Sequence, residues 1–433
     1  MRVPAIDTRP TTIIGGSMKL RKRQMFGAAI AALWLISPAG AAEWITSWAA
    51  SPMSANPPPL FGPLPYSLHN QTLRQVLHLS AGGSRMRVRF TNEFGSAPLK
   101  IGAATITRIK PDGSLDRGGT RKLTFSGRSS TIVPAGAPLL SDPIELPVKA
   151  LADVSLSIYF PEDTGPCTCH QMAIQDGFVS AAGDFTAADF PAAQTVQSRG
   201  FISGVEVDVP HGKTIVVLGD SISDGMGSTP NANRRWPDVL ARRLNTGTAA
   251  WGIANEGISG NRVLEDGAGY SALARLDRDV LALPGVGYVI VFLGVNDLGI
   301  SYGKITLPTS DPNAPPQVVP APANLATAAT MIAGYRQIIA RVHARGAKVF
   351  GATIAPYEGA MYWSAQGEAI RVTINEWIRH GREFDAVLDF DAAFRDPDRP
   401  TRMAEAMQMG DHLHGNDAGY RTVADSIDLK LFQ

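Results

Sequence analysis

A serine, a histidine and a carboxylate occur in surroundings that suit acyl transfer. Ser221 lies in Gly-Asp-Ser-Ile-Ser-Asp-Gly (219–225), directly after an apolar run, where a strand-to-helix turn offers free backbone amides to an attacking oxygen. An ordinary turn with an N-capping serine is the competing interpretation, because Gly-Asp-Ser alone is common. His414 follows Asp411 by three residues, just before a predicted helix. A serine nucleophile needs such a base and a group that orients it.

Two further segments offer hydrogen-bond donors for a developing oxyanion. The segment 255–262 (Asn-Glu-Gly-Ile-Ser-Gly-Asn-Arg) follows a predicted strand, and glycines there let the backbone approach a ligand. Asn296 follows the apolar run 289–293, from where its side-chain amide can point at an oxyanion. For each segment taken alone, an ordinary turn remains an alternative.

The remaining histidines and the cysteines are interpreted as structural. We expect His78, His343 and His380 to be hydrogen-bonded structural residues, and His412 to point away from His414. Cys167 and Cys169 are the two cysteines of the chain and stand next to His170, but their spacing matches no common zinc pattern. A strained disulfide between them is permitted in an oxidising compartment. We therefore predict no metal site and no cofactor.

The elements that must position these residues begin at residue 213. Continuous apolar runs at 214–218, 286–293, 347–354 and 386–390 are typical of strands buried on both faces of a parallel sheet. Stretches with helical spacing, such as 323–345 and 366–379, alternate with them and indicate a doubly wound α/β domain. In such sheets ligands bind beyond the carboxyl ends of the strands, where the motifs above lie. The proline-rich segment 306–322 is predicted to be a long loop over the pocket, with a surface loop that does not shape a binding site as the alternative.

The preceding part of the chain, residues 43–209, has a different pattern. Short alternating runs, for example 73–79, 85–91 and 154–160, are separated by turn residues such as Ala-Gly-Gly-Ser at 81–84. Little helical periodicity lies between them. We expect an all-β antiparallel domain, in the form of a sandwich.

The first 42 residues have the pattern of an export signal. Basic residues at 19–23 precede the apolar run 25–36, and small residues follow at 39–42. The apolar run is about a dozen residues long, which is too short for a membrane-spanning helix. We expect residues 1–17 to be an upstream extension, the signal peptide to be cleaved near Ala42, and the protein to be secreted or periplasmic without stable membrane insertion.

Composition argues against charged macromolecular partners. The 433 residues are 44% hydrophobic and 18% charged, and 40 basic against 39 acidic residues give a net charge of +1. No overall field would attract nucleic acid or an anionic membrane. We expect a neutral or small substrate.

In this order the four segments resemble the motifs of the SGNH (GDSL-like) hydrolase superfamily, over residues 213–433. The resemblance implies that Ser221 is the nucleophile and that Asp411 and His414 complete a catalytic triad. It also implies an oxyanion hole formed by the amides of Ser221 and Gly260 with the side chain of Asn296. Its position within the short motif favours Gly260 over Gly257.

The N-terminal segments Trp-Ile-Thr-Ser-Trp-Ala-Ala-Ser-Pro (44–52), Thr-Leu-Arg-Gln (72–75) and Asn-Glu-Phe-Gly (92–95) resemble secreted esterases of this kind with a β-domain, including acetylxylan-esterase-like members. The resemblance implies a three-layer α/β/α flavodoxin-like hydrolase domain (210–433) behind a sandwich- or jelly-roll-like β-domain (43–209). It also implies a secreted serine esterase for short-chain acyl or acetyl esters of small molecules or polysaccharides.

Two alternatives stay open. One is a broad-specificity lipase- or thioesterase-type acylhydrolase, or a protease, because the oxyanion chemistry is shared and only pocket shape discriminates. Another is a catalytically inert carbohydrate-binding protein. A standard α/β-hydrolase would require a Gly-x-Ser-x-Gly elbow, which the sequence lacks.

Overall fold

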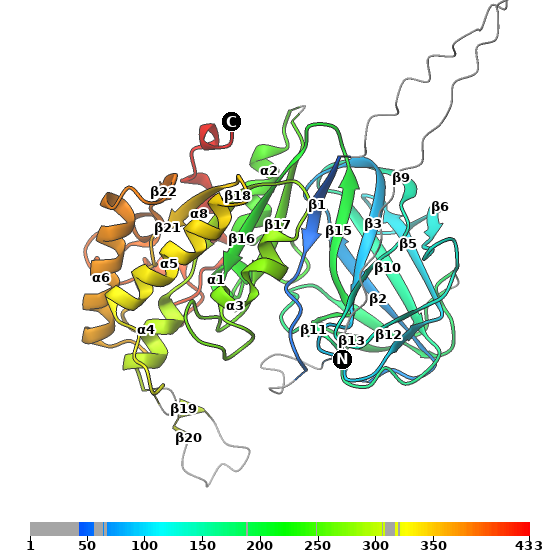
Figure 1. The fold of residues 1–433 in the computed structure, drawn as a ribbon, viewed down its shortest axis with the longest axis horizontal. Coiled ribbons are helices and arrows are strands. Elements are labelled where there is room, and N and C mark those ends of the chain that lie inside the picture. The colour runs from blue at the N-terminus through cyan, green and yellow to red at the C-terminus, as the bar shows by residue number, and fades with distance from the viewer. Residues whose placement is uncertain are drawn as a thin grey trace, which may run out of the picture. The chain divides into compact units, whose positions relative to one another are not determined.

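The apolar runs after residue 212 form a parallel sheet with the strand order β17–β16–β18–β21–β22 (Figure 1). In chain order this is second, first, third, fourth and fifth, the flavodoxin-like doubly wound arrangement that the sequence predicts. The strands are β16 (Lys213–Gly219), β17 (Trp251–Gly257), β18 (Val286–Phe292), β21 (Lys348–Ala352) and β22 (Ala386–Leu388). The second strand extends to Gly257, so residues 255–257 belong to the strand and not, as the sequence predicted, to the segment after it.

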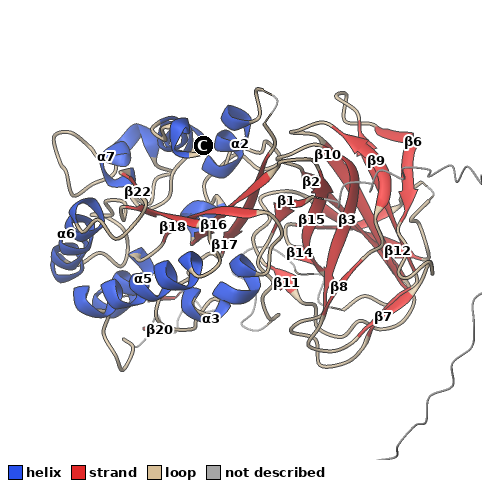
Figure 2. Cartoon of the chain, turned by 45° about the horizontal axis from the view of Figure 1, so that its top comes forward, coloured by secondary structure: helices blue, strands red, loops and turns tan. Residues whose placement is uncertain are grey.

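Helices cover both faces of this sheet, with α2 and α7 on one face and α3 and α5 on the other (Figure 2). They are α1 (Ser221–Asp224), α2 (Trp236–Leu244), α3 (Ala272–Leu276), α4 (Val295–Tyr302), α5 (Ala328–His343), α6 (Ala365–His380), α7 (Phe390–Phe394) and α8 (Asp417–Asp425). A π-helical turn (Asp277–Leu281) continues α3, and 3₁₀ turns lie at Glu405–Met407 and Leu429–Leu431. The layers are therefore α/β/α.

The described residues between 43 and 209 are all-β, in antiparallel sheets. One sheet has the order β1–β15–β3–β8, with β9 also paired to β3, and the other has the order β13–β12–β2–β10–β5–β6. The first comprises β1 (Trp44–Ala49), β3 (Gly83–Thr91), β8 (Pro138–Leu140), β9 (Ile144–Val148) and β15 (Ile202–Asp208). The second comprises β2 (Gln71–His78), β5 (Ala103–Ile109), β6 (Leu115–Lys122), β10 (Asp153–Phe160), β12 (Gly177–Ala182) and β13 (Ala192–Val196). Short pairs join β4 (Leu99–Ile101) to β7 (Thr131–Val133) and β11 (Cys169–His170) to β14 (Arg199–Gly200).

The two sheets enclose one hydrophobic core. Alternate residues of β2 and β3 are buried in it, including Leu73, Leu77, Val88 and Phe90. The period-2 pattern predicted these strands because one face of each is covered by the other sheet. A separate core surrounds the parallel sheet.

Strand β1 joins the two cores. Ile45 is buried in the sandwich core, whereas Ala49 is buried in the core of the α/β part. The amide of Thr46 donates to Thr214 Oγ1 at 2.9 Å, and a methyl group on Gly252 of β17 would lie 2.1 Å from the carbonyl oxygen of Thr46. This close backbone contact packs the β-part against β17, and residues 42–433 form one compact unit.

The computed structural model describes residues 43–55, 64, 67–187, 189–247, 249–304, 306–307, 317–318 and 321–433. The predicted signal peptide and upstream extension, residues 1–42, lie outside the described residues. Within the segment 306–322, where no strand was expected, β19 (Thr306–Leu307) pairs with β20 (Gln317–Val318); the rest of that predicted loop is largely undescribed.

Candidate active site

Ser221 stands where the predicted strand-to-helix turn places it, at the carboxyl end of β16. The side chain of Asp220 accepts a hydrogen bond from the amide of Ile222 at 3.0 Å and so caps α1. The helix ends after one turn at Gly225, whose φ of 103° is readily available only to glycine. Ser221 is the first residue of this helix and is 4% exposed.

The structure brings Ser221, His414 and Asp411 into one hydrogen-bonded row. Ser221 Oγ lies 2.7 Å from His414 Nε2, and His414 Nδ1 lies 2.6 Å from Asp411 Oδ2. A carboxylate at Nδ1 favours the tautomer with its proton on that nitrogen, which leaves Nε2 free to accept the serine proton. This is the geometry required for general-base activation of a hydroxyl.

Local hydrogen bonds hold the acid in place. Asp411 Oδ1 accepts the amides of Leu413 at 3.0 Å and His414 at 2.9 Å. Burial raises the pKa of Asp411, but its hydrogen bond to His414, the charge of that residue and these amides together lower the pKa to about 2. Asp411 therefore remains a carboxylate at any pH at which the protein would work.

The candidate oxyanion donors lie where the chain leaves β16, β17 and β18. Asn296 begins the first turn of α4 and is 4% exposed; its Nδ2 donates to the carbonyl of Asn261 at 3.1 Å. Tyr362 donates its hydroxyl proton to Asn296 Oδ1 at 3.1 Å, which fixes the orientation of the amide. Among the described residues, the amides of Ser221 and Gly260 donate to no other residue. Such free amides are available to a substrate oxygen.

The structure separates the two glycines of the second segment. At Gly257 an added Cβ would lie 2.6 Å from the amide nitrogen of Asp224, so this glycine lets the end of β17 approach α1. Gly260 has a φ of 77° and lies in the turn after the strand. Gly257 thus serves packing, whereas Gly260 presents its amide in a conformation that favours glycine.

Two buried carboxylates lie behind the site. Burial, supplemented by the charge of Asp297, raises the pKa of Asp220 to about 7. Burial also raises the pKa of Asp297 to about 6, although its oxygens accept the amides of Val263 and Leu264. Asp297 thereby fixes the segment that follows Gly260.

Sequence reasoning missed Arg275, which ties the loops of the site together. This fully buried side chain donates from Nε to Asn261 Oδ1 at 3.1 Å and from Nη2 to the carbonyl of Gly219 at 3.1 Å. Its Nη1 donates to Ser51 Oγ of the β-part at 2.8 Å and to the carbonyl of Glu256 at 2.7 Å. An arginine within the otherwise apolar run Ala-Leu-Ala-Arg-Leu (272–276) was the one available signal.

His170 also has a partner that the sequence did not reveal. Its Nε2 lies 2.9 Å from Asp224 Oδ1, on the same short helix as Ser221, and its Nδ1 lies 3.1 Å from the carbonyl of Ser51. The neighbouring cysteines, 167 and 169, form a disulfide with each other. In the described part of the chain, no cluster of three or more His, Cys, Asp or Glu side chains could hold a metal ion.

The other histidines lie apart from the serine. His78 pairs with Asp153 at 2.7 Å and His343 with Asp385 at 2.8 Å, while the nearest carboxylate to His380 is Glu376 at 3.2 Å. His412 has a φ of 60°, and its Nδ1 faces Glu405 at 4.0 Å.

None of the helices in the described residues is both long and apolar enough to span a membrane.

Comparison with known proteins identifies the α/β part. Residues 217–422 match the GDSL-like lipase/acylhydrolase family. None of the curated proteins compared with the chain matches it.

Solved structures that resemble the chain cover about half of it. A lipase/acylhydrolase from Enterococcus faecalis is 19% identical, with 49% of this chain and 92% of that chain covered and a TM-score of 0.36. An acetyl xylan esterase, AlAXEase, is 22% identical, with 49% and 96% covered and a TM-score of 0.36. A carbohydrate acetylesterase from Sinorhizobium meliloti, Est24, is 15% identical, with 49% and 94% covered and a TM-score of 0.34.

Proposed function

We propose that Ser221 is the nucleophile and His414 the general base of a carboxylic ester hydrolase whose residues 217–422 belong to the GDSL-like lipase/acylhydrolase family of SGNH hydrolases. Asp411 is the third member of the triad. The observation that supports this assignment best is the row of short hydrogen bonds, 2.7 Å from serine to histidine and 2.6 Å from histidine to carboxylate.

The reaction proceeds through an acyl-enzyme. Ser221 Oγ attacks the ester carbonyl carbon while His414 Nε2 takes the hydroxyl proton. The carbonyl oxygen becomes an oxyanion, which accepts hydrogen bonds from the amides of Ser221 and Gly260 and from Asn296 Nδ2. His414 then returns the proton to the departing alcohol. A water molecule, deprotonated by His414, attacks the acyl group, and the carboxylic acid leaves as Ser221 regains its proton.

We propose short-chain acyl or acetyl esters carried on carbohydrate as the preferred substrates. Tyr270 supports this choice. Its carbonyl accepts a hydrogen bond from Asn261 Nδ2 at 2.9 Å, so Tyr270 lies next to the turn that contains Gly260. The residue is 48% exposed. Its ring packs against Phe94 of the β-part, with 5.4 Å between centroids. An exposed aromatic surface of this kind suits the C–H face of a sugar ring.

The nucleophile is tested with Ser221→Ala on p-nitrophenyl acetate and on acetylated xylan. We expect the wild type to release acetate from both substrates and the variant from neither. Ser223→Ala is the matched control, because Ser223 is equally buried two residues along the same helix. Equal activity of the wild type and Ser221→Ala would exclude Ser221 as the nucleophile.

Tyr270→Ala tests the carbohydrate preference separately. Loss of the aromatic surface should raise KM for acetylated xylan about fivefold, since a ring contact contributes roughly 1 kcal/mol, and leave p-nitrophenyl acetate hydrolysis unchanged. Val372→Ala, another exposed apolar residue but on α6, serves as the control. If wild-type protein cleaves only the small ester, the broad-specificity acylhydrolase replaces the carbohydrate esterase.

We also propose that the protein is exported after cleavage of a signal peptide near Ala42. The disulfide between Cys167 and Cys169 is compatible with an oxidising compartment. N-terminal sequencing of the protein recovered from periplasm or culture medium tests the proposal; an N-terminus upstream of residue 25 would contradict it.

A further inference from the structure

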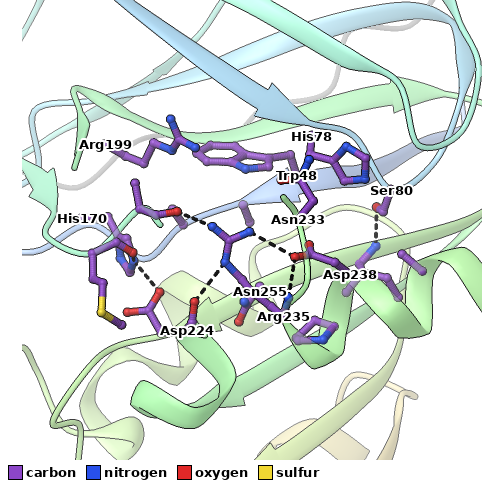
Figure 3. A pocket seen from close by; sticks show the side chains of 17 residues that line it. Trp48, His78, Ser80, His170, Arg199, Asp224, Asn233, Arg235, Asp238 and Asn255 are labelled. Carbon is purple, nitrogen blue, oxygen red and sulfur yellow. Dashed lines mark hydrogen bonds and ion pairs between the residues drawn. The ribbon is translucent and has the colours of Figure 1, made fainter. Parts of the chain in front are cut away.

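A cavity lies between the β-part and the nucleophile-bearing half of the molecule (Figure 3). Trp48, His170 and Arg199 line it from the β-part, and Asp224 and Arg235 from the α/β part. Ser221, His414 and Asp411 are not among its lining residues. Its volume is about 50 Å³, which is several times the space that one water molecule requires.

Arg199 is an unpaired cation in this cavity. The residue is 4% exposed, and its Nη1 is buried without a hydrogen-bond partner. Its guanidinium carbon lies 5.7 Å from the ring centroid of Trp48. Figure 3 shows the two side chains next to each other. Within the described part of the chain, no carboxylate lies within ion-pair distance of it. A buried unpaired charge is costly, so a bound anion would stabilise this site.

The other charges that line the cavity compensate one another. His170 faces Asp224 at 2.9 Å, and Arg235 faces Asp238 at 3.1 Å. Burial and the charge of Arg235 lower the pKa of Arg199 to about 9, against a smaller opposing effect of Asp176. Because each of these two pairs is neutral overall, the guanidinium of Arg199 gives the cavity one excess positive charge.

We propose that this cavity binds a small carboxylate monoanion through Arg199. The planar guanidinium fork matches a carboxylate in geometry, and one negative charge cancels the excess. The indole of Trp48 beside it offers an apolar surface for the hydrocarbon end of the anion. Water alone would hydrate the guanidinium without neutralising it.

The carboxylate can come from two sources, a free short-chain acid or the uronic acid group of a sugar. A volume of about 50 Å³ is small for a whole sugar ring, which favours a free acid such as acetate. The inference does not depend on which residue is the nucleophile, since it uses none of the proposed triad.

Thermal unfolding and calorimetric titration test the proposal at constant ionic strength and pH 7. Sodium acetate, sodium glucuronate and sodium chloride are added to the wild type, to Arg199→Met and to the control Arg74→Met. Arg74 is likewise an arginine stacked on an aromatic ring, Phe190, but it hydrogen-bonds to Ser157 in a different pocket.

For the wild type and Arg74→Met, acetate should raise Tm saturably by about 2 °C or more, whereas chloride should not. Arg199→Met should lose the shift while keeping p-nitrophenyl acetate hydrolysis. A glucuronate response as strong as that of acetate supports a sugar-borne carboxylate as the source.

Three outcomes would overturn the proposal. The first is the absence of saturable heat and of a Tm shift with acetate or glucuronate in the wild type. The second is an equal response to chloride, and the third is an unchanged acetate response in Arg199→Met. If Arg199→Met does not fold, Arg199→Lys replaces it, and a loss of at least fivefold in acetate affinity is expected because the ammonium lacks the planar fork.

Discussion

At the scale of single residues, the site depends on the environment of its carboxylates. Asp411 accepts hydrogen bonds from the ring of His414 and from two backbone amides, and its pKa is lowered to about 2. Asp220 is buried with one amide hydrogen bond beside a second carboxylate, and its pKa is raised to about 7. The pKa values of two carboxylates near the same serine are thus shifted in opposite directions: hydrogen bonds lower the pKa of Asp411, and burial raises the pKa of Asp220.

Replacing Asp411 by Asn should lower kcat for p-nitrophenyl acetate by about 10²- to 10⁴-fold. The amide cannot stabilise an imidazolium and can favour the wrong tautomer of His414, while KM should change little. Asp417→Asn is the control, because the carboxylate of Asp417 accepts hydrogen bonds from Thr229 and Arg234 and not from His414. A less than threefold loss in Asp411→Asn would show that Asp411 is not the orienting acid.

Replacing Asp220 by Asn should make the protein more stable near pH 8. The folded state holds a proton on Asp220 between the unfolded pKa of about 4 and the folded pKa of about 7, so wild-type stability falls as pH rises through this window. Between pH 5 and pH 8 the wild type should lose on the order of 2–4 kcal/mol of unfolding free energy, and Asp220→Asn should not show this loss. Urea unfolding at the two pH values measures it, with Asp112→Asn, at an exposed carboxylate, as the control. The same pH dependence in Asp220→Asn and in the wild type would contradict the prediction.

At the scale of elements, the short helix α1 is the unit that presents the serine. It lies between β16 and the end of β17, and the approach of β17 is possible because Gly257 has no side chain. Asp297 and Arg275 hold the following loop from the other side. The position of the serine relative to the oxyanion donors therefore depends on backbone contacts between strand ends.

Gly257→Ala should reduce kcat about 10- to 100-fold, because its Cβ would lie 2.6 Å from the amide nitrogen of Asp224 and displace α1. Stability should also fall by about 1–3 kcal/mol. Gly247→Ala is the matched control, since an added Cβ meets nothing within 4 Å there. Wild-type activity together with wild-type stability in Gly257→Ala would refute this packing role.

At the scale of the whole molecule, the β-part is joined to the catalytic half by buried polar contacts. Ser51 Oγ donates to Glu256 Oε2 at 2.5 Å and accepts from Arg275. His170 faces acceptors at both ring nitrogens, the carbonyl of Ser51 and the carboxylate of Asp224, so both nitrogens carry protons. The β-part thus supplies a cation to the helix that carries Ser221.

His170→Gln should lower stability most at acid pH. Burial lowers the pKa of His170, but the charge and hydrogen bond of Asp224 and the carbonyl of Ser51 raise it overall, despite an opposing effect of Arg199. The stabilising contribution is present below the unfolded pKa of about 6.5 and is lost as pH rises through the higher folded pKa. Unfolding of both proteins from pH 5.5 to 9 should show a difference that shrinks with pH. His343→Gln, at a half-exposed pair, is the control; a constant difference would contradict the charged state.

The local units could be predicted from the sequence: the parallel strands, the turn that carries Ser221, and the three-residue spacing of Asp411 and His414. These follow from apolar runs, glycine positions and loop-to-helix signals, which act between near neighbours in the chain. The partners of His170 and Arg275 could not be predicted. Ser51 and Arg275 are 224 residues apart, and His170 and Asp224 are 54 apart. Their pairing, and the burial of Arg199 without a carboxylate partner among the described residues, arise only when the β-part packs on β17 and removes these charges from water.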